Sequence, residues 1–169
     1  MIYLIPILRT EFDSVYTQLE NNFISDERRD YDDAKAVLED PAFTMYHILK
    51  NNEKVGFVTI WELDSFDFIE HFVIYENYRN QGLGAKTLDL LKSRGKKLVL
   101  EAELPTDELQ KRRVAFYQRC DFVKNQFDYT QPPYKKGGLG VPMVLMSYPC
   151  ALNDAENTVS KIYKTVYNL

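Results

Sequence analysis

The sequence predicts one α+β domain with a mixed, mostly antiparallel sheet of seven strands and helices on both faces. Its 169 residues are enough for one sizeable hydrophobic core. Strand-like segments follow one another in the first half, and strand and helix patterns then alternate, which is typical of this class. A helical connection between the fourth and fifth strands implies that these two strands lie parallel.

The composition is that of an ordinary globular domain, with 45% apolar and 27% charged residues. A net charge of −4 argues against a nucleic-acid partner and slightly favours a cationic amine substrate. No apolar segment is long enough to span a membrane, and the start of the chain lacks the basic segment of a signal peptide. The two cysteines and two histidines favour neither a disulfide scaffold nor a metal site. We therefore expect a cytoplasmic protein without a metal, either a monomer or a homodimer.

The first elements are expected to be an edge strand and two helical segments. Pro6 lies inside the apolar segment 2–8, and proline is tolerated mainly in edge strands. Thr10 is expected to cap a helix over residues 11–22, because the apolar residues of that segment recur at helical spacing. Ser25 is expected to cap the second helical segment.

The remaining elements follow from alternating apolar patterns and turn residues. An antiparallel meander is expected over residues 42–50, 54–64 and 66–75, with a bulge at Gly56. Three more strands are expected at 97–103, 122–129 and 141–147. Helices are expected after the third strand of the meander, over about 107–119, and in the tail between 153 and 167.

A glycine-containing turn joins the strand at 66–75 to the helix that follows it. The turn has the sequence Arg79-Asn80-Gln81-Gly82-Leu83-Gly84. Its glycines let backbone N–H groups approach a ligand closely, and a helix start adds unpaired donors and a positive dipole end. The pattern therefore predicts a pyrophosphate-binding turn, although a glycine pair alone is equally typical of a tight strand-to-helix connection.

The form Arg-x-x-Gly-x-Gly after a Val-Ile strand resembles motif A of the GNAT superfamily of acyl-CoA N-acyltransferases. Residues 114–122 resemble the second signature of that family, with Asp121 in place of the usual glycine. The resemblance covers roughly residues 1–148 and implies a GNAT-like domain over them, with the fourth and fifth strands splayed apart. Residues 149–169 are expected to form a helical tail that packs on or extends the same domain.

The resemblance also implies acetyl-CoA as co-substrate. In that family the amides of the turn hold the pyrophosphate of coenzyme A, and the preceding strand pairs with the pantetheine arm. The coenzyme A-binding residues implied in this way are Phe72, Val73, Ile74, Arg79, Asn80, Gln81, Gly82, Leu83, Gly84, Ala85 and Lys86.

Tyr117 resembles the family tyrosine that gives a proton to the coenzyme A thiolate. Because a phenol has an ordinary pKa of about 10, it can protonate a thiolate whose pKa is about 8.5 when it lies beside it. The alternative is a helix tyrosine that only packs on the sheet.

Two buried carboxylates, Glu70 and Glu101, are the candidate bases. Strand alternation places Glu70 on one face with Phe66, Phe68 and Phe72, and His71 on the opposite face with Ile69 and Val73. Glu101 shares a face with Val99 and Glu103 in the next strand. Burial among apolar groups would raise the pKa of such a carboxylate. The alternatives are an acidic rim that attracts an ammonium substrate, or a salt bridge to Arg113.

The acceptor side is expected to involve four residues from two segments. Residues 23–29 resemble the start of the acceptor-side helix of the family, and the aromatic, proline-containing loop after residue 128 could wall the pocket or be a rigid surface turn. The predicted substrate-binding residues are Glu27, Glu103, Tyr129 and Tyr134.

These observations predict an N-acetyltransferase that moves an acetyl group from acetyl-CoA to a primary amine of a small molecule or peptide. Direct transfer in a ternary complex is expected, because no cysteine or serine lies where a covalent intermediate would need it. Backbone N–H groups at a splay after Ile74 are expected to stabilise the oxyanion. The alternative is a non-catalytic sensor module that binds acyl-CoA on the same fold.

Overall fold

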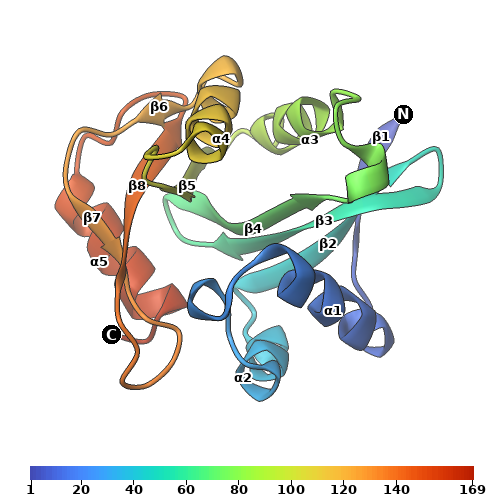
Figure 1. Cartoon of the computed structure of the whole chain (residues 1–169), viewed down its shortest axis with the longest axis horizontal. Coiled ribbons are helices and arrows are strands. Elements are labelled where there is room, and N and C mark those ends of the chain that lie inside the picture. Colours follow the sequence, from blue (N-terminus) through green and yellow to red (C-terminus); the bar gives the residue numbers. More distant parts are fainter.

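A mixed sheet of eight strands forms the centre of the computed structural model, which describes all residues from 1 to 169 (Figure 1). The strand order is β1-β2-β3-β4-β5-β8-β6, and β7 pairs with β8 beside this path. The strands are β1 (Ile2–Pro6), β2 (Phe43–Lys50), β3 (Glu53–Glu62), β4 (Phe66–Ile74), β5 (Lys97–Glu103), β6 (Val123–Lys124), β7 (Tyr129–Gln131) and β8 (Val141–Tyr148).

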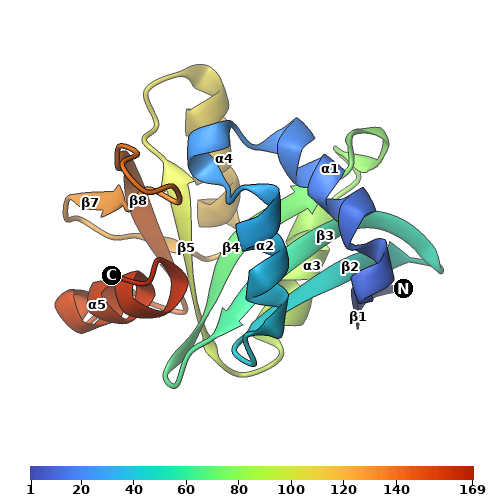
Figure 2. The same cartoon turned by 90° about the horizontal axis from the view of Figure 1, so that it is seen from below.

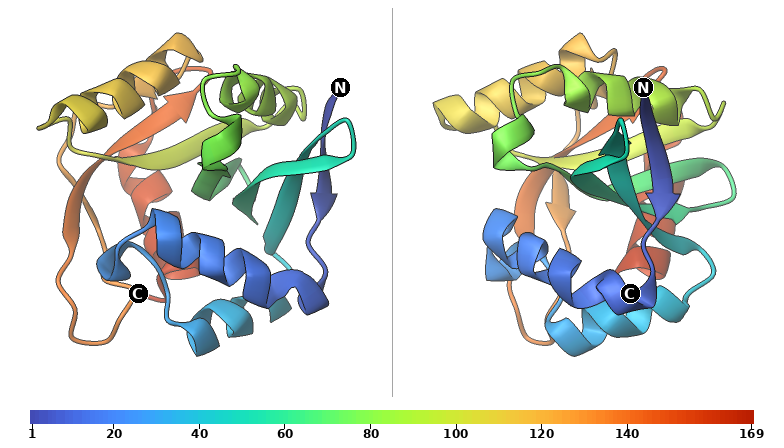
Figure 3. Two further views of the ribbon diagram at one scale, coloured as in Figure 1. Left: turned by 45° about the vertical axis from the view of Figure 1, so that its right-hand side comes forward. Right: turned by 90° about the vertical axis from the view of Figure 1, so that its right-hand side faces the viewer.

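Helices cover both faces of the sheet, as Figures 1 and 3 show. The α-helices are α1 (Phe12–Asn22), α2 (Tyr31–Ala36), α3 (Leu83–Lys92), α4 (Glu108–Arg119) and α5 (Ala155–Val166). Short 3₁₀ segments lie at Arg9–Glu11, Ser25–Glu27, Val37–Glu39 and Glu76–Tyr78. Helices α3 and α4 lie on one face, and α1, α2 and α5 lie on the other (Figure 2). None of these helices combines the length and the apolar character that a membrane crossing requires.

The predicted edge position of β1 is confirmed, but both predicted N-caps are wrong. Thr10 lies inside a 3₁₀ turn, and α1 begins only after Glu11. Glu11 occupies the N-cap position of α1 without a side-chain cap bond, and its carboxylate accepts a hydrogen bond from the Leu8 N–H at 3.1 Å, at the start of the 3₁₀ turn. Ser25 lies in the 3₁₀ turn before α2, and its hydroxyl contacts Lys135 instead of capping the helix.

The predicted strand over residues 122–129 is split in the structure, and the sheet therefore has eight strands instead of seven. Asn125 interrupts it. Its Nδ2 donates to the carbonyl of Leu145 at 3.1 Å, and its Oδ1 accepts from the N–H of Leu152 at 2.9 Å. These side-chain bonds lie where the pairing with β8 is interrupted, after β6 and before β7.

The predicted bulge beside Gly56 is confirmed by a register shift between β2 and β3 at Ile48 and Leu49. A Cβ atom at Gly56 would lie 2.1 Å from the carbonyl oxygen of Val73 on β4. Only glycine therefore lets β3 and β4 approach one another here.

Strands β4 and β5 run parallel only from Phe66 to Ile69, which pair with Lys97 to Leu100. Beyond this point they separate, as the diverging arrows of Figure 2 show. The separation therefore begins at Glu70, before the expected position after Ile74.

A second bulge lies at the same place. The register between β3 and β4 shifts so that His71 pairs with Thr59 while Ile69 pairs with Ile60, and Glu70 has no partner on β3. An extra residue in a strand puts two successive side chains on one face. The predicted faces of His71 and Phe72 are therefore wrong: His71 contacts Phe23 on the α1 side, whereas Phe72 packs with the α3 and α4 core.

The tail packs on the domain core. Ile162, Val166 and Tyr167 of the α5 region are buried in one apolar cluster with Phe68 of β4 and Val99 of β5. Helix α5 thus lies against the sheet on the face opposite α3 and α4, close to the point where β4 and β5 separate (Figure 2).

Candidate active site

A cleft of about 680 Å³ runs from the glycine turn into the gap between β4 and β5. All three elements that the sequence singled out contribute to it: the turn before α3, the two separating strands and helix α4. The predicted residues among its lining are Glu27, Glu70, Phe72, Val73, Ile74, Arg79, Asn80, Gly82, Leu83, Gly84, Ala85, Glu101, Glu103 and Tyr117.

The glycine turn exposes its backbone to the cleft. Gly82 is the N-cap of α3 with φ 70°, a left-handed conformation that suits glycine. No side chain caps this helix start, so its first N–H groups have no partner within the helix or from a cap. A Cβ atom at Gly82 would meet no atom within 4 Å, and the first residues of α3 line the cleft, so the turn borders open space. The turn can therefore hold an anionic group against the end of α3.

Two cations frame this turn. The Arg79 guanidinium donates to the carbonyl of Ile74 at 3.0 Å and to Asn22 Oδ1 at 2.9 Å, which ties the turn to the end of β4 and to α1. Lys50 Nζ lies 3.1 Å from Gln81 Oε1. No pattern in the sequence indicated this second cation, because it comes from β2. Both positive charges favour an anionic group near the helix start.

Tyr117 lines the cleft from α4, where its ring packs between Phe116 and Phe122. Burial raises the pKa of Tyr117 to about 12, against a smaller opposing effect of Arg113. The phenol therefore stays protonated throughout the neutral and mildly alkaline range. A protonated hydroxyl in this position can give a proton to a leaving group in the cleft.

The Glu70 carboxylate is held in an ion pair. Arg29 Nη1 lies 2.5 Å from Glu70 Oε1, and Trp61 and Tyr134 donate to the same carboxylate at 3.1 and 3.0 Å. Burial alone would raise the pKa of Glu70, but Arg29, His71 and the hydrogen bonds outweigh it and lower the pKa below the ordinary value. The expectation that burial raises this pKa is therefore wrong.

The backbone of Glu70, in contrast, faces the cleft. Its side chain is 1% exposed, whereas the residue as a whole is only half-buried, so its exposed surface is main chain. The bulge and the strand separation both fall at this residue.

Glu101 occupies a different environment on β5. Its carboxylate accepts hydrogen bonds from Tyr129, from Tyr167 at 2.8 and 2.9 Å and from Gln131 at 2.9 Å. Burial raises its pKa to about 7 despite these bonds, and the nearby Glu70 charge acts in the same direction. Glu101 is therefore a carboxyl group that can take up or release a proton near neutral pH.

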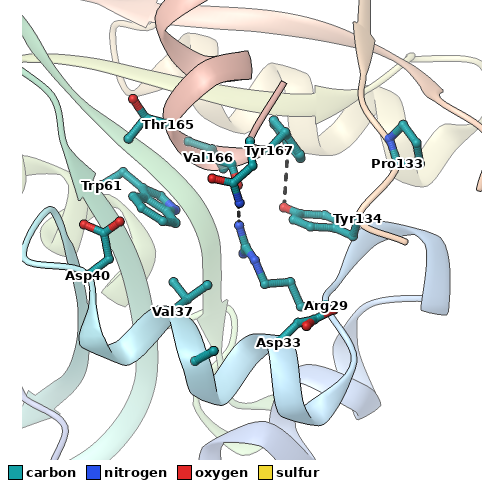
Figure 4. A pocket seen from close by; sticks show the side chains of 12 residues that line it. Arg29, Asp33, Val37, Asp40, Trp61, Pro133, Tyr134, Thr165, Val166 and Tyr167 are labelled. Carbon is teal, nitrogen blue, oxygen red and sulfur yellow. Dashed lines mark hydrogen bonds between the residues drawn. The ribbon is translucent and has the colours of Figure 1, made fainter. Parts of the chain in front are cut away.

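A hydrogen-bonded series of side chains connects the two carboxylates. Tyr167 Oη, bonded to Glu101, lies 3.4 Å from Tyr134 Oη, and Tyr134 is bonded to Glu70. Figure 4 shows Tyr134, Tyr167 and Arg29 at the wall of a second cavity of about 380 Å³, between α2 and the end of α5. The Arg29 guanidinium lies over the rings of Tyr134 and Trp61, at 4.8 and 5.6 Å from their centroids.

The four predicted substrate residues lie in three different settings. Glu27 lines the cleft half-buried, and burial together with the Glu103 charge raises its pKa. Glu103 also lines the cleft, and its carboxylate forms an ion pair with Arg113. A salt bridge to Arg113 was one of the alternatives for the acidic residues of these strands. Tyr129 is buried and Tyr134 is half-buried, and their hydroxyls bond to Glu101 and Glu70, so both belong to the surroundings of the carboxylates and not to the open cleft.

Besides Lys50, the sequence reasoning missed four residues around the two carboxylates: Arg29, Trp61, Gln131 and Tyr167. Trp61 lies in a strand whose apolar pattern explains it fully, and Tyr167 lies in a tail that the resemblance does not cover. Of these residues, only Arg29 could have been inferred from the sequence. A buried carboxylate at Glu70 needs a cation, and Arg28 and Arg29 lie in the segment 23–29 that was assigned to the acceptor side.

Removing the cation from the ion pair should destabilise the fold. Arg29→Met leaves the Glu70 carboxylate buried without its cation, and we expect a loss of about 3–5 kcal/mol in the free energy of unfolding at pH 7. Because the pKa of Glu70 is lowered in the folded protein, the ion pair stabilises above about pH 4.5 and loses its effect as pH falls. Urea unfolding at pH 3 to 8 should therefore show a full loss above about pH 4.5 and a smaller one below it.

Arg28→Met is the matched control. Arg28 donates to Tyr16 Oη at 2.9 Å and its acidic neighbour Glu20 is at 3.7 Å and half-exposed, so we expect a loss of only about 1 kcal/mol. Equal losses in the two variants would contradict the assignment of a buried ion pair to Arg29 and Glu70.

The comparisons with known proteins agree with this geometry. The sequence model of the acetyltransferase (GNAT) family matches residues 6–122. A protein of known structure from Bacteroides thetaiotaomicron, described as an acetyltransferase of the GNAT family, is 32% identical, with a TM-score of 0.91 and 99% of each chain covered.

Two further proteins are similar. YjbC of Bacillus subtilis (strain 168), whose name assigns it to the acetyltransferases, is 33% identical over 114 residues, which are 66% of this chain and 57% of YjbC. The chain thus matches little more than half the length of that relative. The structure of Arabidopsis thaliana NAA60 in complex with acetyl-CoA is 15% identical, with a TM-score of 0.64 and coverage of 88% of this chain and 98% of the other. At that identity the likeness shows the fold alone.

Proposed function

Because the chain belongs to the GNAT family of acetyltransferases, we propose that it transfers an acetyl group from acetyl-CoA to a primary amine, directly in a ternary complex. The observation that carries this proposal is the arrangement of the cleft. An anion-binding helix start, the protonated phenol of Tyr117 and the carboxyl group of Glu101 line one cavity. The co-substrate would supply an activated acyl group, and the side chains around it would manage the two proton transfers.

We propose that coenzyme A binds along β4 and over the start of α3. Its pyrophosphate would accept hydrogen bonds from the free N–H groups after Gly82, with Arg79 and Lys50 nearby. Gly84 lets α4 approach, since a Cβ atom there would lie 3.0 Å from Phe116 Cζ. The remaining predicted contacts, from Phe72 to Lys86, belong to the same strand and helix start.

Glu101 is the proposed base and Tyr117 the proposed acid. Glu101 can take the amine proton because its pKa lies near neutral. Glu70 is a weaker candidate, because Arg29 holds its carboxylate in the charged form and lowers its pKa. We assign Glu70 a positioning role: its bulged backbone would lie beside the acyl carbonyl, where main-chain donors can stabilise negative charge on oxygen.

The acceptor would enter past Glu27 and Glu103; Arg113 balances the Glu103 charge, so Glu27 would be the carboxyl group that meets an ammonium-bearing molecule. We also propose that the reaction takes place in the cytoplasm, where acetyl-CoA is available. The two cysteines are free, which is compatible with a reducing compartment.

The direct test is a screen of amines for release of free coenzyme A thiol. The screen would offer acetyl-CoA with amino acids, amino-acid amides, polyamines, aminoglycosides and peptides, and mass spectrometry would locate the acetyl group. Thiol release that depends on an amine, with a matching acetylated product, supports the proposal. Tight acetyl-CoA binding without turnover on any amine would favour the non-catalytic sensor.

Gly82→Val is expected to weaken acetyl-CoA binding at least about tenfold. Valine at φ 70° is strained by about 1–2 kcal/mol, and its methyl groups would enter the open space beside the turn, where we propose the pyrophosphate binds. Titration calorimetry with acetyl-CoA measures the affinity, and thermal unfolding measures the strain.

Gly95→Val is the matched control, because Gly95 has φ 78°, open space around it and a position beyond the other end of α3. It should lose similar stability and keep wild-type affinity. Unchanged affinity in a folded Gly82→Val variant would remove the turn from the binding site.

A further inference from the structure

The C-terminal tail supplies one hydroxyl to the carboxyl group of Glu101, that of Tyr167, which directly follows α5. This hydroxyl bridges the carboxylate, at 2.9 Å from Oε1 and 2.8 Å from Oε2. Two other donors come from β7 and each reach a single oxygen, since Tyr129 bonds to Oε1 and Gln131 to Oε2. Tyr167 is therefore the donor that contacts both oxygens, and it is the one that comes from outside the sheet.

The neighbours of Tyr167 direct its proton to Glu101. Tyr167 Oη accepts a hydrogen bond from Gln131 Nε2 at 3.1 Å, and an amide nitrogen can only donate. Tyr134 Oη lies 3.4 Å from Tyr167 Oη, and its own proton goes to Glu70 at 3.0 Å. The single proton of Tyr167 therefore goes to the nearest acceptor, the Glu101 carboxylate.

The docking of α5 fixes the place of this hydroxyl. Arg29 Nη2 donates to the carbonyl of Val166 at 2.6 Å (Figure 4), and Tyr163 Oη donates to the carbonyl of Thr130 on β7 at 2.6 Å. Ile162, Val166 and Tyr167 are buried in the apolar cluster beside β4 and β5. The position of the hydroxyl thus depends on the seating of a whole helix and not on a mobile surface side chain.

Hydrogen bonds, and no cation, stabilise the charged form of Glu101. Arg29 pairs with Glu70, whereas the Glu101 carboxylate has no ion-pair partner. Burial and the Glu70 charge oppose ionisation of Glu101, and the bonds from its three donors favour it. The titratable groups that face it are Glu70 of β4, Tyr129 of β7, Tyr134 of the loop after β7, and Tyr163 and Tyr167 of the tail.

We propose that Tyr167 is a positioning residue: its hydroxyl orients the Glu101 carboxylate and holds it in the charged form that takes the amine proton, so that docking of the C-terminal tail completes the active site. This inference rests on the proposed function, in which Glu101 is the base. Tyr167 does not line the cleft and therefore acts through Glu101.

Tyr167→Phe keeps the ring and removes the hydroxyl. A lost hydrogen bond to a charged group corresponds to about 1–2 pH units, so the bend in kcat/KM at which Glu101 ionises should move upward by that amount. With the amine that releases thiol fastest in the screen, kcat/KM at pH 7 should fall by about 5- to 50-fold, and most of the loss should be recovered at pH 10. An equal loss at every pH, with the bend in its wild-type place, would indicate packing alone and overturn the inference.

Tyr163→Phe is the matched control. It removes another hydroxyl of the tail, the one that bonds to the Thr130 carbonyl, and leaves every bond to Glu101 in place. Its bend should stay where it is in the wild type, and thermal unfolding checks that both variants are folded over the pH range. An equal upward shift in both variants would assign the effect to a loosened tail and would overturn the role of the Tyr167 hydroxyl.

A double-variant cycle tests whether Tyr167 acts through Glu101. Glu101→Gln removes the charge that the hydroxyl stabilises, so adding Tyr167→Phe to it should change kcat/KM at pH 7 by less than about twofold. If the two losses multiplied instead, Tyr167 would act independently of Glu101, contrary to the inference.

Carboxyl ¹³C NMR of protein labelled in its glutamate side chains follows Glu101 without any substrate. The Glu101 signal, identified by its absence from Glu101→Gln, should titrate about 1–2 pH units higher in Tyr167→Phe than in the wild type and in Tyr163→Phe. Identical titrations in all three would overturn the inference. Failure of the proposed function looks different, because the wild type would then acetylate no amine while the titrations would still differ.

Discussion

Glu101→Gln is expected to lower kcat/KM at pH 7 by about 100- to 10,000-fold, the range that a positioned base contributes. Glutamine keeps the shape of the side chain and can still accept a hydrogen bond from Tyr167, but it cannot take the amine proton. The loss should shrink toward pH 10, where more of the amine is already unprotonated.

The pH profile identifies the base more sharply than the rate at one pH. With a pKa of about 7, Glu101 becomes ionised as pH rises through that value, so wild-type kcat/KM should bend near pH 7. The bend should be absent from Glu101→Gln between pH 6 and 10. Glu70→Gln should keep it, because the pKa of Glu70 is already low. A bend that survives in Glu101→Gln and disappears in Glu70→Gln would make Glu70 the base.

Protein stability gives an independent check on Glu101. The folded-state pKa of about 7 lies above the ordinary 4.5, so protonation of Glu101 stabilises the fold, and this contribution is lost as pH rises from about 4.5 to 7. Thermal unfolding of Glu101→Gln should lack that decrease. A variant that is stable and inactive cannot be dismissed as unfolded.

Tyr117→Phe is expected to lower kcat by about 10- to 1,000-fold with little change in acetyl-CoA affinity. The hydroxyl would act only when the thiolate leaves, and its raised pKa of about 12 keeps it protonated between pH 6 and 10. Single-turnover kinetics with the best amine from the screen measures the chemical step, and calorimetry measures the affinity.

Tyr46→Phe is the control for the loss of a tyrosine hydroxyl. Tyr46 lies in β2, partly buried against the same apolar cluster as Tyr117 but outside the cleft lining. Its variant should keep kcat within about twofold of the wild type. Wild-type kcat in Tyr117→Phe would leave Tyr117 as a packing residue of α4.

Local patterns were enough for much of the fold. The meander of β2, β3 and β4, the parallel pair of β4 and β5 and the helices α3, α4 and α5 follow from apolar spacing, turn residues and the connection through a helix. The predictions that failed depend on single side-chain bonds. Asn125 splits one predicted strand because its amide bonds to Leu145 and Leu152. The Glu11 carboxylate bonds to the Leu8 N–H and closes a 3₁₀ turn that contains Thr10, so α1 begins one residue later than predicted.

The bulge at Glu70 shows why strand alternation has limits. Strict alternation along β4 assigns side chains to the correct face of the sheet up to Glu70 but to the wrong face for His71 and Phe72. The extra residue at the bulge reverses the face of every side chain that follows it. The bulge is set by the register between β3 and β4, a property of two strands that neither sequence segment records alone.

The sequence by itself determined the family of the fold, the glycine turn that starts α3 and the places of Tyr117, Glu70 and Glu101 on a helix and two strands, because each depends on residues close together in the chain. Only the tertiary structure decided which of the two carboxyl groups has a pKa near neutral pH. Arg29, 41 residues from Glu70 in the chain, lowers the pKa of that group, whereas burial among tyrosines without any cation raises the pKa of Glu101. A pKa depends on the charges and hydrogen bonds that surround a group in space, and the fold brings those together from β3, β7 and the C-terminal tail.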